Sequence, residues 1–151
     1  WTHAYNGRID EAFLFMVISL EQVFSSKLAT SQNIAKRTAV ICHQELEKPF
    51  DEVRRIVSDL YDQRSRIVHD GESPDFDSFS ELQQIATCVL RCLLLNAGNE
   101  LAADNDGKQN LHARWLKLID FIASAVEAQQ LVSEEAFRKC GIEKAGPQND
   151  K

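Results

Sequence analysis

Apolar residues recur along most of the chain at intervals of three and four, the spacing of a buried face on an α-helix. The first such stretch covers residues 9–28, and apolar residues outside its main stripe indicate that this helix is covered on more than one side. A second stretch starts at Thr30 or Ser31, either of which can cap a helix, and ends before Pro49. The pattern therefore predicts two helices in the first third of the chain.

A third helix is predicted from Phe50 to Gly71, because glycine commonly ends helices by adopting a left-handed conformation. Its inward stripe is Val53, Ile56, Val57, Leu60, Tyr61, Ile67 and Val68. A fourth helix is predicted to open at a capping box that begins at Ser78 and ends at Glu81. Residues 99–109 are polar and read as the next connection.

The last third of the chain continues the helical pattern. A fifth helix is predicted over residues 111–126, and a short sixth follows a cap at Ser133 and closes at Cys140 and Gly141. No stretch alternates as a strand does, so the prediction is an all-α bundle of four main helices plus short extra helices. Residues 1–146 are expected to form one domain, and residues 147–151 a frayed polar tail.

Composition agrees with a helical domain that folds without disulfides or metals. The chain has 151 residues, of which 44% are hydrophobic, enough for a sizeable core. No segment approaches the ~20 apolar residues of a membrane span, and no secretory signal opens the chain. The absence of an initiator Met suggests a domain excised from a longer protein, or a processed chain. These features predict a cytoplasmic protein with no membrane contact.

The charge and the cysteines narrow the function classes. A formal net charge of −6 argues against nucleic-acid binding through a broad basic surface, so any such function has to be local. The four cysteines lack the spacing of a disulfide framework and are expected to be reduced. Cys88 and Cys92 share a helix face and could form half of a metal site, with Cys42 and His43 as the other candidates. The favoured interpretation is four small apolar core residues.

Arg64 is the residue that departs from the helical pattern. It lies in the middle of the apolar stripe of the third helix, between Leu60 and Val68. Because an unpaired buried charge costs several kcal/mol, one of two arrangements is expected. Either an acid such as Glu21 meets Arg64 inside the bundle, or the stripe at that level faces a cleft or a second subunit.

His69 follows five residues later, at the last turn of the same helix. On a continuous helix it is turned by about 140° from Arg64 and displaced by about 7.5 Å along the axis, so the two side chains do not share a face. Ser65 does share the face of His69. Because His moves protons near neutral pH while Arg binds phosphate and its developing charge, the set suits phosphodiester chemistry.

The string from Leu60 to Gly71 resembles the motif helix of HEPN domains (higher eukaryotes and prokaryotes nucleotide-binding), and is most similar to their Apea-like branch. That family has an Arg, usually followed by a polar residue, and a His a few residues later; Arg64, Ser65 and His69 match these positions. Asp70 departs from the pattern, because the family often has Gly there. A second pair with permitted spacing, Arg37 and His43, lacks the flanking residues and is interpreted as structural.

The resemblance implies a HEPN-like bundle and a metal-independent endoribonuclease that needs no cofactor and no metal. Arg64, Ser65 and His69 would be catalytic, RNA would be the substrate, and two copies would form a homodimer through the motif helix. Such domains act as toxins or in antiphage defence, controlled by an antitoxin or an attached regulatory domain. The alternative is a non-catalytic helical dimerisation module, or a regulatory module that binds nucleotides or RNA.

Overall fold

A computed structural model describes the backbone of residues 2–24, 30–101 and 111–142, and the side chains of residues 9–24, 30–95 and 112–142. Within these ranges the chain is all-α, as the sequence predicts, with six helices and no strand. The helices are α1 (Thr2–Phe24), α2 (Ser31–Cys42), α3 (Phe50–Asp70), α4 (Phe76–Leu101), α5 (Leu111–Glu127) and α6 (Glu134–Lys139).

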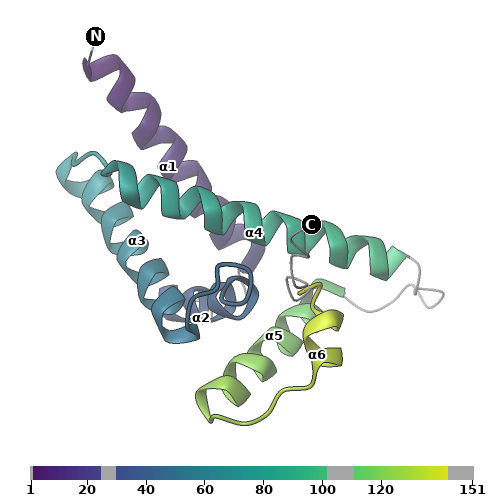
Figure 1. The fold of residues 1–151 in the computed structure, drawn as a ribbon. Helices are drawn as coiled ribbons and strands as arrows, with labels where there is room; N and C mark the ends of the chain where they lie inside the picture. The colour runs from purple at the N-terminus through teal and green to yellow at the C-terminus, as the bar shows by residue number, and fades with distance from the viewer. Residues whose placement is uncertain (1, 25–29, 102–110, 143–151) are drawn as a thin grey trace, which may run out of the picture.

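The short helix α2 lies at the centre of the bundle, where it packs most extensively on α3 and also contacts α1, α4 and α5. In Figure 1, α4 crosses α1 near the α3–α4 turn, and α5 and α6 lie at the opposite end of the molecule. The N-terminal end of α1 extends past that turn. Eight of the twelve residues of α2 are buried, as expected for a helix with neighbours on several sides.

Local signals set most helix ends where the sequence places them. The Thr30 hydroxyl accepts a hydrogen bond from the Asn33 amide, and the Ser133 hydroxyl accepts one from the Ala136 amide. Gly71 ends α3 with φ at 68°, the left-handed conformation that glycine adopts without strain. The structure places the start of α1 at Thr2, earlier than predicted, and residues 25–28 of that prediction lie outside the described residues.

Two predicted boundaries of α4 are wrong. The helix begins at Phe76 and has no capping box, because the Ser78 amide donates to Asp75 Oδ1 at 2.7 Å and the Ser78 hydroxyl donates to Asp75 Oδ2 at 3.0 Å. The Phe79 amide also donates to the Asp75 carbonyl. At its other end α4 continues through Asn99 to Leu101, where a polar connection was expected. Residues 102–109 and the predicted tail at 147–151 lie outside the described residues.

Replacing Asp75 with alanine is expected to lower the free energy of unfolding by about 1 kcal/mol, the usual worth of an N-cap. Hydrogen bonds from Ser78 hold the pKa of the Asp75 carboxyl below its ordinary value. The carboxylate therefore stabilises the fold above the unfolded pKa of about 3.9, and this contribution is lost as the pH falls through the lower folded value.

Urea unfolding at pH 7 and again below pH 4 measures this effect, with Glu81→Ala as the control from the predicted capping box. The Glu81 variant should stay within about 0.5 kcal/mol of wild type. A larger loss for Glu81→Ala than for Asp75→Ala at pH 7 would contradict the assignment of Asp75 as the cap.

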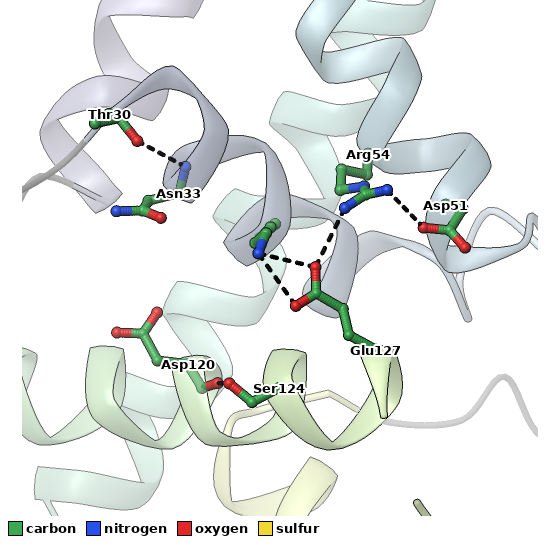
Figure 2. Close-up of polar contacts among 8 residues, drawn as sticks. Thr30, Asn33, Asp51, Arg54, Asp120, Ser124 and Glu127 are labelled. Atoms are coloured by element: carbon green, nitrogen blue, oxygen red, sulfur yellow. Dashed lines mark hydrogen bonds and ion pairs between the residues drawn. The ribbon is translucent and has the colours of Figure 1, made fainter. Parts of the chain in front are cut away.

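Ion pairs join α5 to the helices beside it. Arg37, only 5% exposed, donates from Nε to Asp120 Oδ1 at 2.7 Å and from a terminal nitrogen to Oδ2 at 2.8 Å, and it also donates to the Phe24 carbonyl. Figure 2 shows Glu127 of α5 reaching Arg54 of α3, at 3.2 Å. These contacts bring α2, α3 and α5 together around two carboxylates.

Candidate functional site

The predicted site residues lie on the C-terminal half of α3. The stripe of that helix is buried at Val53, Val57, Leu60 and Ile67, as the pattern predicts. Val68 is the exception, because its side chain is 52% exposed. In this half of α3, the side of the helix that faces the bundle therefore includes Gln63, which is buried, and Arg64, which is half-buried. Val68 faces solvent instead.

Arg64 is half-buried and makes no hydrogen bond and no ion pair within the described part of the chain. Its Nε is shielded from solvent without a partner, whereas its two terminal nitrogens are not among the shielded atoms and so reach solvent. Of the two arrangements that the sequence leaves open, the paired one is not seen, because the Glu21 carboxylate does not come within ion-pair distance. One side of the guanidinium is therefore shielded without a partner, and its terminal nitrogens are open to solvent.

Ser65 and His69 are exposed on the outer face of α3, and so is Asp70. His69 occupies the last turn, where the helix leaves backbone carbonyls without partners. The structure brings Ser65 and His69 to one face but does not bring Arg64 to it, because α3 is a continuous helix between them. One copy of the chain therefore presents the Arg and the His in different directions.

The Tyr61 side chain lies near both Arg64 and Glu21, where α3 contacts α1. The Tyr61 hydroxyl is buried without a hydrogen bond among the described residues. Burial raises the pKa of Tyr61, the Glu21 carboxylate adds to this rise, and the Arg64 guanidinium opposes it. Sequence reasoning placed Tyr61 in the apolar stripe and missed its polar end. Its position three residues before Arg64, on the same face, is the signal that could have found it.

The α3–α4 turn beside the site is fastened by polar side chains. Ser73 donates to Asp10 Oδ2 of α1 at 3.3 Å, and Gln63 Nε2 lies 3.5 Å from Asp75 Oδ2. These bonds connect the turn to α1 on one side and to α3 on the other. They hold the end of α3, and therefore His69, in a defined place relative to α1.

The second Arg–His pair is structural, as the sequence analysis expects. Arg37 is buried against Asp120, and the His43 ring lies between Phe50 and Phe137. Nδ1 of His43 is 3.0 Å from the Ala39 carbonyl, one turn earlier in the same helix. Both side chains are therefore engaged in contacts that hold α2 to its neighbours.

All four cysteines are buried as free thiols, which agrees with the core interpretation. Burial raises the pKa of Cys92 and of Cys140 to about 12, so neither thiol ionises at neutral pH. Cys92 donates to the Cys140 carbonyl, which also accepts from the Trp115 indole. Among the described residues, no group of three or more His, Cys, Asp or Glu side chains could hold a metal ion.

A hollow with a volume of about 650 Å³ lies between α2 and α3, away from the motif residues. It is lined by Gln32, Ala35, Asp51, Glu52, Arg54, Arg55 and Ser58. Its charged groups are two Arg and two acids, so no single sign of charge dominates. The hollow does not include Arg64 or His69.

None of the described helices is long and apolar enough to span a bilayer.

Comparison with known proteins identifies no relative of this chain. No protein-family model, no curated protein sequence and no solved structure matches the chain at a significant level.

Proposed function

We propose that this chain is a HEPN-type metal-independent endoribonuclease domain that acts in the cytoplasm as part of a toxin or an antiphage-defence effector. The observation that carries the proposal is the state of Arg64. It lies in an apolar stripe, has no carboxylate partner within the described residues, and keeps its outer nitrogens accessible. A guanidinium retained in this way at a cost in stability suits a group that binds an anion from outside.

The proposed reaction is an internal transesterification of RNA. The ribose 2′-oxygen attacks the adjacent phosphorus, and the bond from phosphorus to the 5′-oxygen of the next nucleotide breaks. The products are a 2′,3′-cyclic phosphate and a 5′-hydroxyl end, so the step needs no external oxidant or metal. His69 transfers the proton, Arg64 stabilises the charge that develops on the phosphate oxygens, and Ser65 orients the imidazole or a phosphate oxygen.

A two-fold homodimer through α3 is part of the proposal. Since Arg64 and His69 of one copy point in different directions, two copies around one phosphate supply both groups to the same cleft. The dimer also supplies two imidazoles. One can accept the proton of the 2′-hydroxyl while the other protonates the leaving 5′-oxygen.

Cleavage of RNA is expected to survive the removal of divalent metal ions, because the proposed chemistry uses only His, Arg and Ser. The measurement is incubation of the purified protein with mixed single-stranded RNA in excess EDTA, followed by end-group analysis for 2′,3′-cyclic phosphates. His69→Ala, prepared in parallel, links any cleavage to this site. Activity that disappears in EDTA and returns with Mg²⁺ would overturn the mechanism.

A second candidate function is a non-catalytic dimerisation or nucleotide-binding regulatory module. It is favoured by two large apolar side chains that are exposed near the α3–α4 turn, Val68 at 52% and Phe76 at 81%. Such residues suit a protein contact. A protein that dimerises in sedimentation experiments but leaves every RNA intact would support this module over the nuclease.

A further inference from the structure

Two polar atoms of α3, three residues apart, are buried without a hydrogen bond among the described residues. They are the Tyr61 hydroxyl oxygen and Arg64 Nε. A buried polar group without a partner destabilises a fold, and native structures contain few of them. Since both lie on one helix and Arg64 belongs to the proposed site, we infer that this part of α3 serves a purpose other than stability.

Both atoms are hydrogen-bond donors. Tyr61 and Arg64 are three residues apart on α3, so their side chains lie on one face of the helix. The Arg64 guanidinium is close enough to Tyr61 to influence its phenol. A phenolic O–H and a guanidinium together offer the donors that an oxyanion accepts.

Glu21 of α1 lies across the contact from these donors. It is half-buried, it is close enough to Tyr61 to influence the phenol, and it makes no hydrogen bond or ion pair within the described residues. Its carboxylate carries the same sign of charge as a phosphate. Because no hydrogen bond or ion pair to a described residue holds its carboxylate, Glu21 can change its side-chain rotamer without breaking one.

We propose that the Tyr61 hydroxyl, shielded in the free protein, is uncovered when the Glu21 side chain turns away, that it then binds the same phosphate group as the Arg64 guanidinium, and that Glu21 opposes this binding by its charge. This inference rests on the proposed function and deepens it. It adds Tyr61 to the phosphate site and identifies the Glu21 carboxylate as a group of the same chain that competes with the phosphate. Tyr61 is retained instead of phenylalanine, at a cost to the free protein, because the hydroxyl finds its partner when phosphate is bound.

The test uses inorganic phosphate as the probe, titrated against the full chain at constant ionic strength in chloride, with binding followed by calorimetry. Tyr61→Phe keeps the ring and removes the hydroxyl, and it should weaken phosphate binding by roughly tenfold or more. Glu21→Gln removes the charge and should tighten binding several-fold, since a like charge nearby disfavours an anion. The same titration with a 2′-deoxy oligonucleotide, which has no attacking hydroxyl, measures binding of a phosphodiester.

Urea unfolding of the phosphate-free protein gives a second, independent readout. Tyr61→Phe should be at least as stable as wild type, because the variant no longer buries a hydroxyl without a partner. Thr38→Val is the matched control, since the Thr38 hydroxyl on α2 is also buried without a partner. It should leave phosphate binding unchanged.

Equal phosphate affinity in wild type and Tyr61→Phe, or no measurable phosphate binding by wild type, would overturn the inference. Weaker binding by Glu21→Gln would overturn the role of Glu21. These outcomes are separate from failure of the proposed function. A protein that binds phosphate through Tyr61 and Arg64 but cleaves no RNA would support the site and contradict the nuclease.

Discussion

Replacement of His69 by alanine is expected to lower the rate of RNA cleavage by about 10²–10⁴-fold, the usual contribution of a general acid or base. The fold should remain intact, because the His69 side chain is exposed at the last turn of α3. Replacement of Arg64 by alanine should cost about 10²–10³-fold, as the loss of one charge-stabilising donor does elsewhere. Single-turnover cleavage of a labelled RNA, with circular dichroism to monitor helicity, measures both effects.

Arg66→Ala is the matched control for Arg64→Ala. It removes the same charge from the same helix, but Arg66 is exposed and lies 3.8 Å from Glu72, an ion pair of little worth. His43→Ala is the control for the second Arg–His pair and should retain cleavage when rates are normalised to the folded fraction. If His43 proves essential and His69 dispensable, the site has been assigned to the wrong helix.

Replacement of Asp120 by alanine is expected to lower the free energy of unfolding by about 3 kcal/mol. Among the described residues, the substitution leaves the buried Arg37 guanidinium with the Phe24 carbonyl as its one remaining partner. Asp120 itself is 49% exposed on its side chain, so solvent screens part of the attraction and the loss should not exceed this value. Urea unfolding at pH 7 measures the difference.

A double variant separates two contributions to the free energy of unfolding. One is the cost of burying the Arg37 guanidinium without a carboxylate, and the other is the net stabilisation by the Arg37–Asp120 ion pair. Arg37→Met with Asp120→Ala fills the same space without a buried charge and should recover most of the lost stability. Lys36→Ala is the control, because Lys36 forms a half-exposed ion pair with Glu127 and should cost no more than about 1 kcal/mol. A loss below 1 kcal/mol for Asp120→Ala would show that the buried pair does not stabilise the bundle.

The sequence by itself determined those features that depend on a few neighbouring residues. The cap at Ser133 and the stop at Gly71 are formed within one turn, so the residue types suffice to place them, and the cap of α2 was narrowed to Thr30 or Ser31, of which the structure has Thr30. The apolar periodicity likewise determined the all-α class, since an amphipathic helix must bury its stripe. The position of Arg64 within such a stripe followed from the same periodicity.

The start of α4 depended on residues that lie further apart. Asp75 and Ser78 are both good N-caps, and local sequence favoured Ser78 because Glu81 completes a capping box. In the structure Asp75 caps the helix, and its carboxylate also lies 3.5 Å from Gln63 Nε2 on α3. A contact between α3 and the start of α4 thus favours Asp75 over Ser78 as the N-cap, a choice that the sequence alone does not make.

Only the tertiary structure decided which arginine is paired. Arg37 and Arg64 both lie on inward faces of their helices, yet Arg37 meets a carboxylate from α5 and Arg64 meets none within the described residues. Asp120 is 83 positions from Arg37 along the chain, so no local pattern announces the pair. Helix periodicity determines which direction a side chain points, whereas the packing of distant helices determines what it meets there.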